Sequence, residues 1–150
     1  MPNVSIVIPL YNCEDTIRRS MRSVLNQTYR DFEVIAVDNN CSDGTMGIIQ
    51  DEFSELMDIK IVKCEEKGIE AALNTGLREA TGDWIARQDG DDYWYPEKLE
   101  KQISYLENNP DIDILGTQIR LLDEHGNVEE QGTFGVKVNY PTENNMIKIA

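Results

Sequence analysis

Short apolar runs alternate with segments of helical period along most of this chain. The apolar runs, which are rich in Val and Ile, lie at residues 4–8, 32–37, 58–63 and 84–88. Runs of this length and composition are typical of buried strands, whereas the segments between them repeat their apolar residues every three or four positions, as a helix does. This alternation predicts an α/β fold, in which a mostly parallel sheet is covered by helices on both faces in three layers. The crossover connections are expected to be right-handed.

The expected helices carry recognisable start signals. Asn12, with Asp15 three residues later, resembles a capping box for the first helix. Ser42 or Asp43 is placed to cap the second helix. Pro96 is expected to open the fourth helix at its first helical position.

The third helix and the C-terminal part complete this outline. One stripe of the third helix is expected to face the core, namely Ile69, Ala72, Leu73, Gly76, Leu77 and Ala80. Gly82 is expected to end this helix. Two further strands are expected within 111–122 and 126–134, joined through a "DEHGN" turn, and the first turns of another helix within 141–150.

One domain over residues 1–150 is expected, because a chain of 150 residues buries enough surface to form a single core. The net charge of −14 argues against nucleic acid or an anionic membrane as a partner, since either requires a basic face. No stretch reaches the roughly 20 apolar residues of a membrane span. The apolar N-terminal run also lacks the basic start of a signal peptide. Three widely spaced cysteines, interpreted as reduced thiols, favour a cytoplasmic protein.

Polar segments follow three of the expected strands. They read "PLYN", "DNNCSDG" and "DGDD". In open parallel sheets ligands bind beyond the carboxyl ends of the strands, so these segments are expected to converge on one crevice. The last segment places Asp89, Asp91 and Asp92 around Gly90, although like charges this close repel one another.

A divalent cation would account for this acidic cluster. In an extended segment Asp89 and Asp91 fall on the same side, and Gly90 lets backbone and ligand approach closely. The neighbouring basic residues are too few to neutralise so many carboxylates. Mg²⁺ and Mn²⁺ favour a site of one or two carboxylates that a diphosphate and water complete, and the chain has no glycine-rich phosphate loop to replace the metal. Taken alone, the pattern also fits a solvated acidic turn.

Three longer stretches occur in order along the chain. They are "VSIVIPLYNCEDTIRRSMRSVLNQTYRDFEVIAVDNNCSDGT", "GIEAALNTGLREATGDWIARQDGDD" and "YWYPEKLEKQISYL". Together they resemble the family 2 glycosyltransferases of the GT-A fold, a Rossmann-like arrangement, and the likeness runs from Val4 to about Gly126. The resemblance implies an inverting, metal-dependent enzyme that uses a nucleotide-sugar donor, most often a UDP-sugar, with Mn²⁺ or Mg²⁺ as cofactor. The acceptor, a glycan, a lipid or a small molecule, stays open.

The resemblance also implies roles for residues in the first half of the chain. Pro9 and Tyr11 would flank the base, with the Tyr11 ring against uracil, and Glu14 would help to shape that pocket. Asp38 would reach the nucleoside. Asn39 departs from the family's usual Asp, which accepts the uracil N3–H, but an Asn can still accept through its side-chain oxygen.

Further roles are implied around the acidic cluster. Asp91 would bind the metal directly, and Asp89 would contact the ribose or a metal-bound water as the second candidate ligand. Asp92 would orient the sugar or support the shell around the metal. Lys67 would meet the donor phosphate or ribose, and Asn74 retains a residue of the family's nucleotide-sugar site.

An inverting transfer needs a general base that deprotonates the acceptor hydroxyl opposite the leaving diphosphate. The family's base comes well after the metal motif, and Asp123, Glu124 and Glu143 are candidates here by residue type alone. The chain is therefore expected to be either part of a longer enzyme or a very small family member. Its activity is expected to be limited to slow donor hydrolysis, unless a second copy completes the site in a homodimer. A sugar nucleotidyltransferase and a non-catalytic nucleotide-sugar-binding module remain as alternatives.

Overall fold

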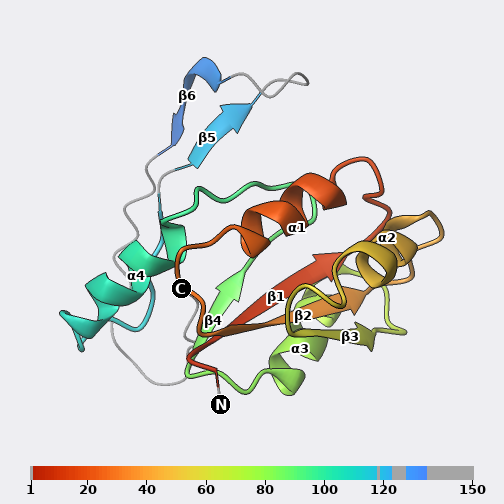
Figure 1. Ribbon diagram of the computed structural model, residues 1–150, viewed down its shortest axis with the longest axis horizontal. Helices are drawn as coiled ribbons and strands as arrows, with labels where there is room; N and C mark the ends of the chain where they lie inside the picture. The colour runs from red at the N-terminus through yellow and green to blue at the C-terminus, as the bar shows by residue number, and fades with distance from the viewer. Residues whose placement is uncertain (1, 118, 123–127, 135–150) are drawn as a thin grey trace.

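The computed structural model describes residues 2–117, 119–122 and 128–134 (Figure 1). In chain order the elements are β1 (Val4–Leu10), α1 (Ile17–Leu25), β2 (Phe32–Asp38), α2 (Thr45–Glu52), β3 (Ile59–Lys63), α3 (Ile69–Glu79), β4 (Trp84–Arg87), α4 (Lys98–Glu107), β5 (Ile119–Leu122) and β6 (Val128–Phe134). The alternation of strand and helix from β1 to α4 is the one that the sequence predicts. Within the described ranges no helix is long and apolar enough to cross a membrane.

Four strands form a parallel sheet in the order β3-β2-β1-β4. β1 lies inside this sheet, where Val4 pairs with Phe32 of β2 on one side and with Trp84 of β4 on the other. Because the strands are parallel, their carboxyl ends meet at one edge. The chain moves outward from β1 to β3 and then returns to the opposite side of β1, so the strand order reverses there. In folds of this class, ligands bind at such a reversal.

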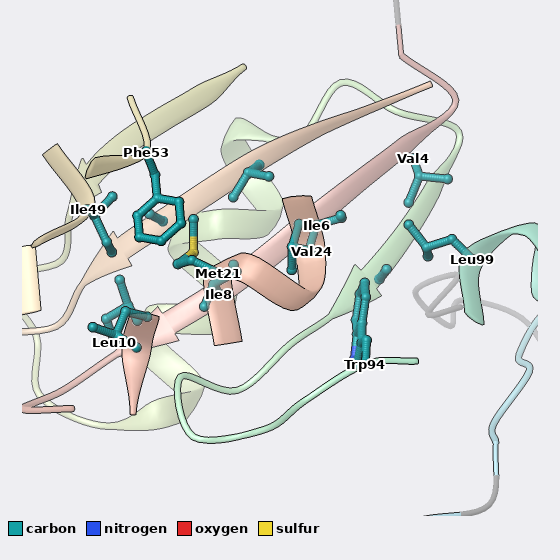
Figure 2. Packing of buried hydrophobic residues seen from close by; sticks show 14 of the residues in the cluster. Val4, Ile6, Ile8, Leu10, Met21, Val24, Ile49, Phe53, Trp94 and Leu99 are labelled. Carbon is teal, nitrogen blue, oxygen red and sulfur yellow. The ribbon is translucent and has the colours of Figure 1, made fainter. Parts of the chain in front are cut away.

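Alternate residues of β1 and β2 point to opposite faces of the sheet. The even-numbered residues, among them Ile6, pack against α1, α2 and α4, and Figure 2 shows Met21 and Val24 of α1 in this cluster. The odd-numbered residues, among them Val7, pack against α3 through Ala72. Helices therefore cover both faces, and the predicted three-layer architecture is confirmed (Figure 1).

α1 begins at Ile17, later than a capping box at Asn12 predicts, so that prediction is wrong. Asn12 has a φ of 46°, a left-handed conformation that Asn tolerates better than most residues and that differs from the extended backbone of an N-cap. Its side-chain oxygen accepts a hydrogen bond from Ser42 N at 2.8 Å. Asn12 thus links the loop after β1 to the loop after β2 instead of starting a helix.

α2 begins at Thr45, with Gly44 as the residue before it. Asp43 caps this helix from one position further out, because its Oδ1 accepts a hydrogen bond from Thr45 N at 3.1 Å. Of the two predicted capping residues, Asp43 is therefore the one that bonds the helix, whereas Ser42 N is held by the loop after β1.

Pro96 and Gly82 act outside the helices that they were expected to start and end. α4 begins at Lys98, so Pro96 lies in the turn before the helix and not at its first position. α3 ends at Glu79, and Gly82 follows where the chain passes β1. A Cβ at residue 82 would lie 2.7 Å from Ser5 N, so glycine is required there for the close approach of two backbone segments.

β5 and β6 form a separate antiparallel pair, in which Ile119 lies opposite Phe134. This pair confirms the two strands predicted in the C-terminal part. The turn predicted between them and the helix predicted within 141–150 lie outside the described residues.

Candidate functional site

Loops at the carboxyl ends of the strands border two adjoining cavities. The smaller cavity, of about 390 Å³, is lined by Pro9, Leu10, Tyr11, Asn39, Lys67, Gly68, Ile69 and Ala72. The larger cavity, of about 590 Å³, is lined by Pro9, Tyr11, Asn12, Cys13, Glu14, Asp15, Thr16, Asp43, Ile69, Asp89, Gly90 and Asp91. Because Pro9, Tyr11 and Ile69 border both, the two cavities form one continuous site. This is the crevice that the sequence predicts.

Most of the predicted site residues border this site. The smaller cavity brings together Pro9, Tyr11, Asn39 and Lys67, and the larger one brings together Glu14, Asp89, Gly90 and Asp91. Asp38, Asn74 and Asp92 line neither cavity among the described residues. Asp38 instead shapes the loop after β2, because its Oδ1 accepts from Cys41 N at 2.8 Å. Asn74 is exposed on α3.

Tyr11 forms the rim shared by the two cavities. Its side chain is 62% exposed although it directly follows a buried strand. Ile69, the first residue of α3, also borders both cavities and is 50% exposed. Two exposed apolar side chains at the mouth of a cavity suit a flat ring such as a nucleobase, which can stack on Tyr11.

Asn39 holds the loop between β3 and α3. Its side-chain Nδ2 donates to Glu66 O at 2.6 Å, and its Oδ1 accepts from Gly68 N at 3.0 Å. The residue is only 6% exposed, and Gly68 has a φ of 118°, which favours glycine. Turning the amide over would break both hydrogen bonds, so the orientation of Oδ1 is fixed by the loop. Oδ1 keeps a second lone pair that can accept from a ligand.

Glu14 joins the loops after β1 and β2. Its Oε2 accepts from Gly44 N at 2.6 Å, while Glu14 N donates to Asp43 Oδ2 at 3.1 Å. These reciprocal bonds fix one wall of the larger cavity. The carboxylate of Glu14 therefore acts through the backbone of the neighbouring loop, which is compatible with the pocket-shaping role that the resemblance implies.

The three carboxylates of the acidic segment differ in their surroundings. Arg87 binds Asp89 through two parallel hydrogen bonds, from Nε to Oδ1 and from Nη2 to Oδ2, each 2.9 Å long. The side chain of Asp91 has no hydrogen-bond or ion-pair partner within the described part of the chain. Desolvation, together with the charges of Asp89 and Asp91, raises the pKa of Asp92. Asp91 is therefore the carboxylate that is available to a ligand in the larger cavity.

The similarity of this chain to known proteins shows the family to which it belongs. The model of glycosyl transferase family 2 matches residues 5–149. The chain belongs to glycosyltransferase family 2.

Curated relatives of this family 2 chain include glycosyltransferases of bacteria. EpsE of Bacillus subtilis (strain 168), itself a provisionally assigned glycosyltransferase, is 41% identical over 127 residues, which are 83% of this chain and 46% of EpsE. WfaP of Escherichia coli, a UDP-Glc:alpha-D-GlcNAc-diphosphoundecaprenol beta-1,3-glucosyltransferase, is 42% identical over 108 residues, which are 71% of this chain and 42% of WfaP. The chain thus spans less than half the length of these relatives.

Solved structures of similar proteins share the fold. S. aureus TarS 1-349 in complex with UDP matches with a TM-score of 0.71 and 26% identity, covering 75% of this chain and 34% of TarS. The mannosyltransferase PcManGT from Pyrobaculum calidifontis, in complex with GDP-Man and Mn²⁺, matches with a TM-score of 0.69 and 27% identity, covering 79% of this chain and 36% of PcManGT. These matches confirm the GT-A fold that the resemblance implies.

The side chains of the family 2 site can be compared with the ligands that a divalent metal requires. No group of three His, Cys, Asp or Glu side chains that could hold an ion occurs within the described part of the chain. A site made by protein alone is thus not formed by these residues. Mg²⁺ needs only one or two carboxylates when a diphosphate and water complete its shell, and the free carboxylate of Asp91 meets that requirement. The residues present therefore fit a metal that arrives together with a diphosphate.

Two features of this family 2 site were missed in the sequence. Ile69 was expected on the buried stripe of the third helix, but at the first position of α3 it is exposed and borders both cavities. Arg87 was among the candidate basic partners of the acidic cluster, but its specific pairing with Asp89 was not predicted. Their spacing of two residues places both side chains on the same side of an extended segment and could have indicated the pair. The predicted base candidates Asp123, Glu124 and Glu143 lie outside the described residues.

Proposed function

We propose that this chain binds a UDP-sugar together with Mn²⁺ or Mg²⁺ and transfers the sugar to an acceptor hydroxyl with inversion. The observation that carries the proposal is the carboxylate of Asp91, which no described residue pairs with, in a cavity that continues into an apolar one. The apolar cavity suits a base, and the acidic cavity suits a metal-bound diphosphate. A nucleotide-sugar combines these two chemistries in one molecule.

The choice of a uridine donor has two supports. TarS 1-349 is known in complex with UDP and with UDP-GlcNAc. In this chain, the fixed Oδ1 of Asn39 is an acceptor at the smaller cavity, and uracil offers a matching donor at N3. Tyr11 would lie against the base, next to Pro9.

Each remaining residue of the site has a proposed task toward the donor. Asp91 would hold the metal, and the metal would supply positive charge that stabilises the leaving diphosphate. Asp89, oriented by Arg87, would contact the ribose or a metal-bound water. Lys67 at the smaller cavity would meet a donor phosphate or the ribose. Asp92, beyond the cavity lining, would orient the transferred sugar from the end of the acidic segment.

Inversion requires one direct displacement at the sugar carbon. The acceptor oxygen attacks opposite the leaving diphosphate, and a general base takes the proton of the acceptor hydroxyl. Asp123, Glu124 and Glu143 remain the candidates for this base. We also take residues 1–150 as a single donor-binding domain, and a second copy in a homodimer could contribute to the acceptor side.

Calorimetric titration with UDP tests the proposal directly. We expect UDP to bind in the presence of Mn²⁺ and to bind much more weakly in EDTA, because few cations other than the metal can neutralise its diphosphate at this site. CDP and GDP serve as controls for the preference of the site for one nucleobase. Equal UDP affinity in Mn²⁺ and in EDTA would contradict the role of the metal.

A further inference from the structure

Two buried side chains hold the ends of the acidic segment. Ser20 Oγ donates a hydrogen bond to Asp89 O at 3.0 Å, and Gln88 Nε2 donates to Asp92 O at 2.9 Å. Gln88 Nε2 also donates to Ser20 Oγ at 2.9 Å, so the two side chains form one connected network. Ser20 is 0% and Gln88 1% exposed. Hydrogen bonds orient their partners firmly in such an environment, because little water competes for them.

Two further side chains hold the middle of the same segment. Thr16 Oγ1 donates to Gly90 O at 3.0 Å, and Arg19 Nη2 donates to Asp91 O at 3.3 Å. Thr16 directly precedes α1, and Arg19 lies in its first turn beside Ser20. One helix end therefore supplies three of the donors.

Four consecutive backbone carbonyls, those of residues 89–92, thus each accept a hydrogen bond from a side chain. We call the four donor residues Thr16, Arg19, Ser20 and Gln88 the carbonyl cradle. Packing restricts the segment further, because a Cβ at residue 90 would lie 2.7 Å from Cys13 Sγ. The cradle engages the backbone and leaves the side chain of Asp91 to the larger cavity.

We propose that the carbonyl cradle is a positioning device, which fixes the backbone of residues 89–92 so that Asp91 is presented to a metal-bound diphosphate without prior reordering. The cradle residues act through the backbone of the acidic segment and not as ligands. Affinity rises when a binding group is held in its bound conformation beforehand, because less conformational entropy is lost on binding. This inference rests on the proposed function, since it concerns the same donor site.

Ser20→Ala and Ser23→Ala form a matched pair for the test. Both remove one hydroxyl from a buried position of α1, and Ser23 Oγ accepts from Trp94 N at 3.1 Å, outside the cradle. We expect Ser20→Ala to lower the UDP affinity in Mn²⁺ by about tenfold and to leave the affinity in EDTA unchanged. Ser23→Ala is expected to leave both affinities unchanged. Equal affinities for the two variants in Mn²⁺ would overturn the proposal.

Thr16 offers a second pair in case Ser20→Ala does not fold. Thr16→Val keeps the shape of the side chain and removes the hydroxyl, whereas Thr16→Ser keeps the hydroxyl. We expect weaker Mn²⁺-dependent UDP binding in Thr16→Val and binding like that of the wild type in Thr16→Ser. The same UDP affinity in both variants would contradict the proposed positioning role of the carbonyl cradle.

Amide hydrogen exchange, measured without ligand, tests the carbonyl cradle independently of the proposed function. Asp92 N donates to Asp89 O at 3.1 Å, the same carbonyl that Ser20 holds. Without any ligand, we expect the Asp92 amide to exchange faster in Ser20→Ala and at the wild-type rate in Ser23→Ala. If wild-type protein fails to bind UDP with Mn²⁺, the proposed function is wrong, and the cradle is then judged by this exchange alone. An unchanged rate in Ser20→Ala would overturn it.

Discussion

At the scale of single residues, Asp91 and Asp43 border the same cavity but differ in what they bind. Asp43 accepts hydrogen bonds from Glu14 N and Thr45 N, each 3.1 Å long, and these bonds outweigh desolvation and lower its pKa. Asp91 has no such partner among the described residues. We expect Asp91→Asn to reduce the Mn²⁺-dependent UDP affinity by at least about tenfold, because a ligand charge is lost.

Asp43→Asn is the control for this substitution. It makes the same chemical change in the same cavity but alters a helix cap, so it is expected to cost modest stability and little affinity. Calorimetry measures the affinities and thermal unfolding measures the stabilities. Similar UDP affinities for the two variants would show that the metal ligand has been assigned to the wrong residue.

The geometry of Asn39 predicts which nucleobase the site prefers. Its Oδ1 is held by Gly68 N and its Nδ2 by Glu66 O, so the site offers an acceptor and not a donor to the base. Uracil has a donor at N3 where cytosine has an acceptor, and we therefore expect UDP to bind about tenfold more tightly than CDP. Competition binding in Mn²⁺ measures the ratio. A preference for CDP would mean that the amide is turned the other way.

At the scale of elements, Glu33 fastens three segments at the amino end of the sheet. Its Oε1 accepts from Ser5 Oγ of β1 at 2.6 Å, from Thr81 N at 2.7 Å and from Thr81 Oγ1 at 2.8 Å. Partial desolvation raises the pKa of Glu33, but these hydrogen bonds outweigh it, and the net pKa lies below the ordinary value of 4.5. The folded state therefore favours the charged carboxylate.

This shift predicts how stability depends on pH. A carboxyl whose pKa is lowered on folding adds stability above its unfolded pKa, and this contribution is lost as the pH falls through the folded pKa. We expect Glu33→Gln to be less stable than the wild type at pH 6 and the difference to shrink below about pH 4.5. Urea unfolding across this range measures it. A difference that is constant with pH would contradict the assignment.

The elements also show how far the sequence could be interpreted. Strand and helix identities were predictable because short runs rich in Val and Ile, alternating with segments of a three- to four-residue apolar period, are large signals. Helix starts were not, because Asn12 and Pro96 carry out tasks in loops that no local pattern distinguishes from capping. In the site, the convergence of Tyr11 and Asp91 was predictable because both follow strands of one parallel sheet, whose carboxyl ends meet at one edge. The cradle depends on distances across the fold, which the sequence does not contain.

At the scale of the whole molecule, release of the sugar to water and transfer to an acceptor make different demands on the protein. Both need the site that binds the nucleotide-sugar, but transfer also needs an acceptor held in line and a general base within hydrogen-bond reach. A metal-bound diphosphate is still a good leaving group toward water. We therefore expect the 150-residue chain to release sugar to water at least as fast as it transfers sugar to any simple acceptor.

Product analysis with a radiolabelled UDP-sugar, with and without a panel of acceptors, measures both rates. The Asp91→Asn variant serves as the control for release that depends on the site. Efficient transfer would refute the expectation and would direct attention to Asp123, Glu124 and Glu143, to be replaced one at a time. Absence of both release and transfer, with UDP still bound, would favour the non-catalytic binding module.

The central position of β1 has a consequence for how the protein folds while it is being synthesised on the ribosome. β1 is synthesised before the other three strands of the parallel sheet. β2 soon pairs with one of its edges, but the other edge stays unpaired until β4 is synthesised, whose Trp84 pairs with Val4. At roughly 5–20 residues per second, this edge stays open for several seconds. Its unpaired amides and carbonyls can meanwhile capture a strand from another nascent chain. We therefore expect a chain stalled before residue 84 to aggregate more readily than the 150-residue chain.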